Sequence, residues 1–181
     1  MEKDNEIISI LSNIVNRFTD YFSDSIENKH IPEESWHYIP YPVGFLNVDL
    51  EIIDSCLEDN ENLNIIEVGC GIGVNAFFMK RYFNNSYVKG IDIDPKTLEI
   101  GKKLFGDHVE YLEKDAFEED YSQFDIVFFY MPFSTEEDQL KFEEKVFEEI
   151  SPGTVVFSGM FEHKIKKDNI IFVTPEIYVK K

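Results

Sequence analysis

Cysteine, basic residues and long apolar runs are scarce in this chain of 181 residues. Its two cysteines are too few for a disulfide framework, so the sequence indicates a reducing compartment. No apolar run reaches the length of a membrane span, and the first residues lack the basic and apolar regions of a signal peptide. We therefore expect a cytoplasmic protein that does not enter the membrane.

Acidic residues outnumber basic residues by 36 to 17, which gives a formal net charge of -19. A field of this sign repels phosphate backbones, so the composition disfavours DNA or RNA as a bulk substrate. It favours a basic or neutral target, such as a lysine-bearing protein or a small molecule, although acidity also simply maintains solubility. The chain is long enough for one domain with a proper core and too short for two of ordinary size.

From residue 59 onward, short apolar segments alternate with helical patterns. Repeated units of this kind predict an α/β fold, doubly wound around a mostly parallel sheet, with the ligand at the carboxyl ends of the strands. The last segment before residue 170, GMFEHKIKKDN, lacks a helical pattern and is expected to be a loop. The expected strands are 63–68, 87–91, 109–112, 124–130, 154–158, 170–173 and 177–179; the expected helices are 73–83, 95–105 and one that begins at Ser134 or Thr135, where Ser134 and Glu137 have capping-box spacing.

The first 58 residues are interpreted as a helical extension or lid over a compact core of residues 59–181. An amphipathic helix is predicted at residues 5–22 and a second one at about residues 44–57. Between them lies WHYIPYP, whose prolines favour an extended or turned segment with exposed aromatic rings. The apolar face of the second helix is predicted to comprise Phe45, Val48, Ile52, Ile53 and Cys56.

A glycine-rich turn after the first core strand carries the strongest functional signal. Residues 65–75 read IIEVGCGIGVN, and the next strand ends in GIDIDP, with Asp92 closing its apolar run. A strand that enters a glycine turn, followed by a second strand that ends in an acid, is how an α/β sheet holds the ribose of a nucleoside cofactor. Glycines let the backbone approach the ligand, and the carboxylate accepts hydrogen bonds from the ribose hydroxyls.

The spacing of the glycines distinguishes between cofactors. The dinucleotide fingerprint Gly-x-Gly-x-x-Gly needs a third glycine where this chain has Val74. The glycines instead follow Glu67 in the pattern E-x-G-x-G-x-G, which resembles motif I of the class I S-adenosylmethionine-dependent methyltransferases. The stretch GIDIDPKTLEIGKK resembles the acidic loop of the same family. This resemblance implies a seven-stranded sheet with an antiparallel last strand, S-adenosyl-L-methionine as cofactor, and methyl transfer to an acceptor.

The resemblance also implies which residues bind the cofactor. The glycine turn would wrap its methionine portion, Asp92 would bind the ribose, and residues after the second and third strands would line the adenine. Asp94 is assigned to the start of a helix as its N-cap, before Pro95, and Asn75 to the surface. The residues so implied are Glu67, near the cofactor's amino group, Gly69, Cys70, Gly71, Gly73, Asp92, Ile93, Asp115, which would accept from the adenine amino group, and Ala116.

The acceptor is less well specified. Relatives that methylate nucleic acids or amides often read Asn-Pro-Pro-Tyr where this chain has YMPF, so the missing amide disfavours adenine or glutamine. HYIPYP and SPGTVVFS are similar to segments of small lysine methyltransferases, which read DLGSGDGR where this chain reads EVGCGIGV. The aromatic residues could hold an alkylammonium by cation–π attraction or could cover the sheet edge. The candidate substrate residues are Trp36, Tyr38, Tyr41, Tyr130, Pro132 and Phe133.

No side chain is singled out as catalytic, because an activated methyl donor mainly requires positioning and exclusion of water. Tyr130, His37 and His163 are candidates for removing a proton from an amine. Two alternatives stay open: an oxidoreductase that uses a nicotinamide cofactor, and a non-catalytic binding protein that has kept the fold. Val74 and the lack of a second domain count against the oxidoreductase. No metal site is predicted.

Overall fold

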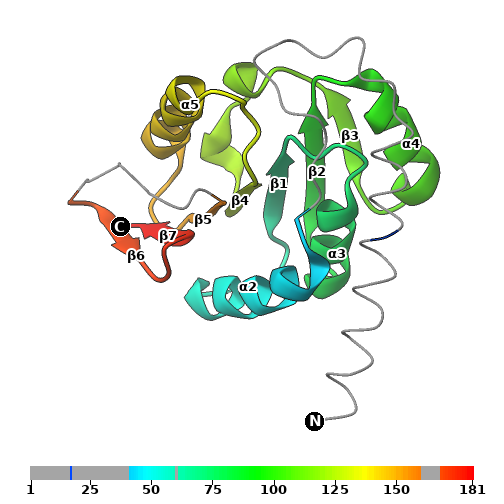
Figure 1. Ribbon diagram of the computed structural model, residues 1–181. Coiled ribbons are helices and arrows are strands. Elements are labelled where there is room, and N and C mark those ends of the chain that lie inside the picture. Colours follow the sequence, from blue (N-terminus) through cyan, green and yellow to red (C-terminus); the bar gives the residue numbers. More distant parts are fainter. Residues whose placement is uncertain (1–16, 18–40, 60, 160–167) are drawn as a thin grey trace.

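A seven-stranded sheet organises the chain (Figure 1). The computed structural model describes residues 17, 41–59, 61–159 and 168–181. The strands lie in the order β3-β2-β1-β4-β5-β7-β6; those from β3 to β5 are parallel, and β7 is antiparallel to both of its neighbours. This confirms the predicted doubly wound, mostly parallel sheet. The strands are β1 (Asn64–Val68), β2 (Tyr87–Asp92), β3 (Glu110–Glu113), β4 (Ile126–Phe129), β5 (Val155–Ser158), β6 (Ile170–Phe172) and β7 (Ile177–Lys180).

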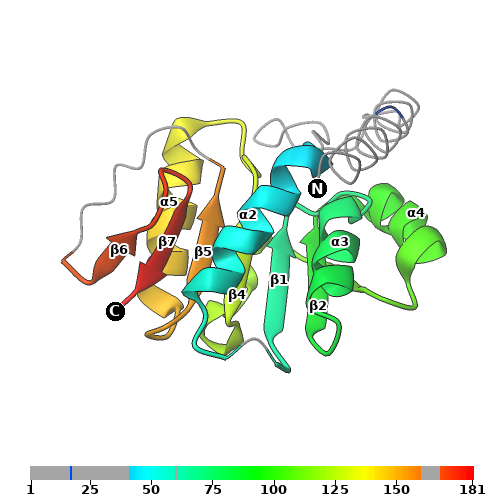
Figure 2. The same ribbon diagram turned by 90° about the horizontal axis from the view of Figure 1, so that it is seen from below.

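Helices cover both faces of the sheet. Figure 2 shows α2, α3 and α4 on one face and α5 on the other. The strand order reverses its direction at β1, so right-handed crossovers place the helices before and after this point on opposite faces. The helices are α2 (Val43–Cys56), α3 (Val74–Tyr82), α4 (Pro95–Phe105) and α5 (Glu136–Glu149), and two short 3-10 turns, η1 (Ala116–Glu118) and η2 (Tyr121–Gln123), were not predicted.

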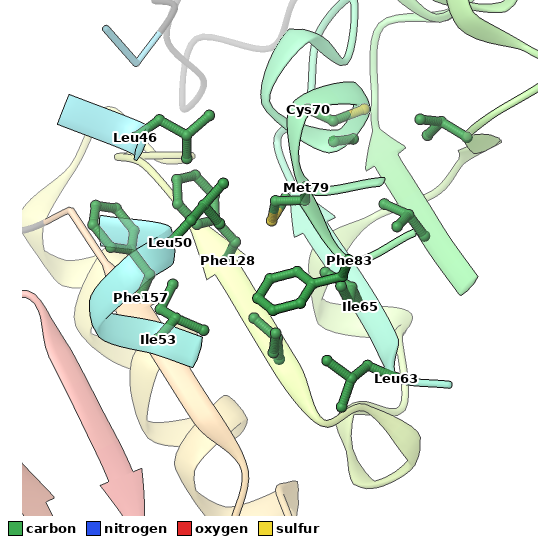
Figure 3. Packing of buried hydrophobic residues seen from close by; sticks show 14 of the residues in the cluster. Leu46, Leu50, Ile53, Leu63, Ile65, Cys70, Met79, Phe83, Phe128 and Phe157 are labelled. Atoms are coloured by element: carbon green, nitrogen blue, oxygen red, sulfur yellow. The ribbon is translucent and has the colours of Figure 1, made fainter. Parts of the chain in front are cut away.

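The core has a layer on each face of the sheet. Ile65 and Ile66 are neighbours in β1, yet both are fully buried, because one belongs to the layer under α2 and α3 and the other to the layer under α5. A strand buried on both faces reads as a continuous apolar run, which is why the sequence located these strands well. In the first layer, shown in Figure 3, Phe128 and Phe157 are paired in register and stack with ring centroids 4.3 Å apart.

The predicted buried face of α2 was wrong at two of its five residues and omitted Leu46 and Leu50. Phe45 and Val48 are 65% and 54% exposed, whereas Leu46, Leu50 and Ile53 pack into the first core layer (Figure 3). The helix carries two apolar stripes with helical spacing, so periodicity alone could not choose between them. Only contact with the sheet decides the choice. Ile53 was assigned correctly, and Ile52 and Cys56 lie half-buried at the edge of the same layer.

Side-chain caps mark the starts of α4 and α5. Asp94 accepts a hydrogen bond from the backbone N–H of Lys96 at 2.9 Å, as predicted for an N-cap before Pro95. The cap of α5 is Thr135, whose Oγ1 accepts from the N–H of Asp138 at 3.1 Å. Of the two starts that the sequence allowed for this helix, Thr135 is therefore the observed one, and the predicted capping box at Ser134 is displaced by one residue.

Several predictions fall on residues outside the described ranges. They include the helix at residues 5–22 apart from residue 17, most of the loop before residue 170, the candidate substrate residues Trp36 and Tyr38, and the candidate bases His37 and His163. The boundary after residue 58 and the lid function of the first unit stay predictions, although α2 packs on the sheet as a layer of the core. Within the part of the chain that the structure describes, no helix has the length and apolar character needed to span a membrane.

Candidate functional site

The turn between β1 and α3 is built from glycines in the left-handed region. Gly69, Gly71 and Gly73 have φ angles of 68°, 53° and 75°, which side chains rarely adopt. The N–H of Cys70 donates to the carbonyl of Ile91 at 3.0 Å, so the turn is also tied to β2. A Cβ at Gly69 would lie 3.1 Å from the Cβ of Pro132, in the loop after β4. The turn therefore lies at the carboxyl ends of β1, β2 and β4, the switch point of the sheet.

Cys70 turns its side chain away from this surface. Its thiol is fully buried in the first core layer (Figure 3), and burial raises its pKa well above the usual value. A Cβ at Gly90 would lie 2.8 Å from the Cys70 sulfur, so the thiol fills space next to β2. If Cys70 contacts a ligand, its backbone is the part that does so.

Gly73 has a packing role that the sequence did not reveal. The ring of Tyr111, from β3, lies beneath the turn, and its hydroxyl donates to the carbonyl of Ile72 at 3.1 Å. A Cβ at Gly73 would come within 2.6 Å of Cε1 of this ring. Tyr111 thus explains why residue 73 is glycine, and a contact between Gly73 and the cofactor stays a prediction.

Asp92 joins the end of β2 to the glycine turn. Its Oδ2 accepts from the N–H of Gly71 at 2.7 Å, and its Oδ1 accepts from the N–H of Asp94 at 2.8 Å. Burial raises the pKa of the Asp92 carboxyl, and these backbone bonds act in the opposite direction. A carboxylate has about four acceptor positions, and the backbone does not use all of them, so the Asp92 carboxylate keeps acceptor capacity for a ribose. Asp92 can therefore shape the turn and bind a sugar at the same time.

Glu67 lies beneath the turn and joins β1 to the first turn of α3. Its Oε1 accepts from the side-chain amide of Asn75 at 2.9 Å, and its Oε2 accepts from the N–H of Ala76 at 2.8 Å. Glu67 and Asn75 are only 3% and 4% exposed, so the prediction that Asn75 is a surface residue was wrong. A direct contact between Glu67 and the cofactor stays a prediction, since both of its oxygens already have partners.

The pKa of Glu67 leads to a testable pH dependence. Burial raises this pKa to about 8, from an ordinary value of 4.5. Between these two values the folded chain keeps a proton that the unfolded chain releases, so the free energy of unfolding falls as the pH rises, by at most about 1.4 kcal/mol per pH unit. The neutral Glu67→Gln variant should lack this decline. Its amide could bond to Asn75 Oδ1, which has no partner in the described ranges.

Chemical denaturation of wild type and Glu67→Gln between pH 4.5 and 8.5 would measure this effect. The difference between the two free energies should shift steadily in favour of the variant as the pH rises. Parallel pH profiles would show that Glu67 does not keep its proton in the folded state.

The residues expected at the adenine lie after β2 and β3. Ile93 is half-buried, Asp115 is exposed, and Ala116 is buried. The Asp115 carboxylate accepts from the N–H of Phe117 at 2.8 Å and so caps η1, while the Ala116 carbonyl accepts from the Tyr121 hydroxyl at 2.8 Å. The N–H of Lys114 donates to the carbonyl of Asp92 at 3.0 Å, which brings this segment next to the end of β2.

The YMPF segment divides between the two faces of the sheet. The ring of Tyr130 lies 4.9 Å from that of Tyr41, which precedes α2 by two residues. Phe133 instead packs against Phe117 and Phe142, each at a centroid distance of 5.2 Å, in the layer under α5. Pro132 lies between these two groups against Gly69. The structure therefore brings Tyr41 and Tyr130 together and separates Phe133 from them.

The residues present fit a nucleoside cofactor with a polar tail. A half-buried carboxylate with unused acceptor positions ends β2, and Gly69 is exposed in the turn beside it, whereas Gly71 and Gly73 are buried. Val74 is 3% exposed and packs with Val43 and Ile72. A core side chain therefore occupies the position at which the dinucleotide fingerprint has its third glycine. In the described ranges, no group of three or more His, Cys, Asp and Glu side chains is placed to hold a metal ion.

Comparison with known proteins gives consistent results. Residues 65–153 match a family model described as a methyltransferase domain. A curated relative, the malonyl-[acyl-carrier protein] O-methyltransferase 1 of Ilyobacter polytropus, is 27% identical over 106 residues. This match covers 56% of the chain but 39% of the relative, so the chain spans well under half of that protein's length.

Two solved structures extend the comparison to the fold. An RNA methyltransferase from Salinibacter ruber, in complex with S-adenosyl-L-homocysteine, is 25% identical with a TM-score of 0.59, and the match covers 78% of this chain and 91% of that one. PKMT2 from Rickettsia typhi, in complex with AdoHcy, is 24% identical with a TM-score of 0.53, and the match covers 67% of this chain and 26% of that one. Both matches support the same fold as that of these methyltransferases.

Proposed function

We propose that this chain, which carries a class I S-adenosylmethionine-dependent methyltransferase domain, binds S-adenosyl-L-methionine at the glycine turn and transfers its methyl group to an acceptor. The observation that best supports the site is the bond from Gly71 to Asp92, which joins the turn and the acidic strand end at the switch point. Val74 argues against the nicotinamide alternative, because a buried valine stands where a dinucleotide site needs glycine.

Each part of the site has a role in this proposal. The backbone from Gly69 to Gly73 surrounds the amino-acid portion, Asp92 holds the ribose hydroxyls, and Ile93 and Ala116 flank the base. When bound, the cofactor supplies a methyl carbon already activated by a sulfonium. The chain therefore has to orient the acceptor and exclude water, and no side chain has to form a covalent bond.

The acceptor is not named by the relatives. RNA and an acyl-carrier protein belong to the names of those proteins, and each is a different class of substrate. The net charge of -19 opposes a phosphate backbone, so we propose a protein or small-molecule acceptor. Tyr130 lies at the carboxyl end of β4, where the acceptor would enter, whereas His37 and His163 lie outside the described residues.

Two measurements test this function. Calorimetric titration should show binding of S-adenosyl-L-homocysteine and no binding of NADH. Incubation of the protein with methyl-labelled S-adenosyl-L-methionine and cell extract should place label in protein or small molecules. Binding of NADH alone would reverse the assignment, and cofactor binding without transfer to any component would support the non-catalytic alternative.

A further inference from the structure

We propose that the acceptor is a cationic amine, held against the paired rings of Tyr41 and Tyr130 and beside the carboxylates of Asp49 and Glu176. The inference rests on the proposed function and names its substrate class. It depends on three observations: two packed aromatic rings, two carboxylates that form no ion pair with a described residue, and a direct link from this place to the glycine turn.

The two tyrosine rings are held from several sides. Tyr41 lies 4.9 Å from Tyr130, and its ring also packs edgewise on Phe157 at 5.2 Å. Tyr130 is backed by Gly159, where an added Cβ would lie 3.0 Å from Cε2 of the tyrosine. Neither ring can move far without disturbing the end of β4 or β5. Ordered aromatic faces of this kind attract an ammonium group.

The two carboxylates border the same rings. Asp49, on α2, accepts a hydrogen bond from the Tyr41 hydroxyl at 2.6 Å. Glu176, before β7, is near enough for its charge to raise the pKa of both Asp49 and Tyr41, in addition to the effect of burial. Asp49 and Glu176 are both half-buried. Two like charges in this setting are unfavourable, and a bound cation would relieve the repulsion.

No cation of the described chain neutralises this pair. The ion pairs among the described residues include neither Asp49 nor Glu176. The buried acid Glu119, by contrast, is paired with cations: its carboxylate contacts Lys89 at 2.9 Å and Lys114 at 3.3 Å. The carboxylates beside Tyr41 are thus left for a cation from outside, and the net charge of -19 would attract one.

The position suits methyl transfer. Two residues beyond Tyr130, Pro132 packs against Gly69 at the entry to the glycine turn. An amine held against these two rings would lie at the mouth of the proposed cofactor site. The ammonium first loses one proton to water. The neutral nitrogen then forms the N–C bond while the C–S bond breaks, its electron pair stays on sulfur, and the positive charge passes to the methylated amine.

Binding of two matched probes tests the charge preference. Benzylammonium and benzyl alcohol have the same ring and differ in charge, and each can be titrated into the protein by NMR, with and without S-adenosyl-L-homocysteine. Benzylammonium should bind about ten-fold more tightly or better, and Asp49→Asn or Glu176→Gln should each reduce this preference several-fold. Asp107→Asn, which removes an equal charge at an exposed turn after α4, should leave it unchanged.

The outcomes separate the inference from the function on which it rests. Equal affinity for the two probes, binding of neither probe, or a preference that survives in both variants would overturn the amine site. Glu176 and Asp49 lie on different elements. If one of the two variants fails to fold, the other can still be tested. Failure to bind S-adenosyl-L-homocysteine would instead contradict the proposed function. The preference for benzylammonium over benzyl alcohol can still be measured without that compound.

A chemical block of the acceptor gives a second test. Cell extract treated with acetic anhydride, which acylates free amines, should lose nearly all of its capacity to receive label from S-adenosyl-L-methionine. Label that enters the treated and untreated extracts equally would show that the acceptor atom is not an amine nitrogen.

Discussion

We expect the Asp92→Ala variant to bind S-adenosyl-L-homocysteine about ten-fold more weakly or worse than wild type. Hydrogen bonds to a charged group contribute roughly 1.5–3 kcal/mol, and the proposed ribose contact would be lost. The substitution also removes the acceptor of the Gly71 and Asp94 N–H groups, so the turn itself should loosen. Calorimetric titration of the two proteins under the same conditions measures the change.

Asp94→Ala is the matched control for this variant. Asp94 lies two residues away and caps α4 through its bond from Lys96. Losing this cap should lower the free energy of unfolding by about 1 kcal/mol and change the affinity for S-adenosyl-L-homocysteine by no more than a few-fold. Equal affinities of Asp92→Ala and wild type would remove Asp92 from the site.

The second large effect is on stability, at Gly73. A side chain at a φ of 75° costs about 1–2 kcal/mol in backbone strain. The new Cβ of Gly73→Ala would also collide with the Tyr111 ring, and overpacking of this kind typically costs about 1–3 kcal/mol. We therefore expect a total loss of about 2–5 kcal/mol in the free energy of unfolding, measured by chemical denaturation.

Gly153→Ala separates the two contributions. Gly153 also has a positive φ, of 91°, but nothing lies within 4 Å of an added Cβ. This variant should lose about 1–2 kcal/mol from strain alone. If Gly73→Ala is no less stable than Gly153→Ala, the ring of Tyr111 does not restrict residue 73.

The positions of the central strands along the chain could be predicted because these strands are buried on both faces of the sheet. Segments such as IIEV and IVFF are apolar at every position or nearly so, and glycine or acidic residues mark their ends. The stripe that α2 buries could not be predicted from periodicity, since Phe45 and Val48 compete with Leu46 and Leu50 at the same spacing. Only the fit against Phe128 and Phe157 selects the second stripe.

The proposed cofactor site could be predicted from the sequence because short local motifs indicate it. A glycine turn and an acid at the next strand end are short motifs, and the structure joins them through Gly71 and Asp92. The contact by which Tyr111 supports the turn could not be predicted, because it joins residues that are far apart in the chain. The same is true of Asp49 and Glu176, which meet only when α2 and β7 are assembled on one sheet.

A crystal structure of the protein soaked with S-adenosyl-L-homocysteine tests the central claim most directly. We predict density for the compound along the glycine turn, with both ribose hydroxyls within hydrogen-bonding distance of the Asp92 carboxylate and the sulfur directed toward Tyr130. Density for the compound at another place, or a site that stays empty while calorimetry detects no binding, would contradict the assignment of this turn to a methyl donor.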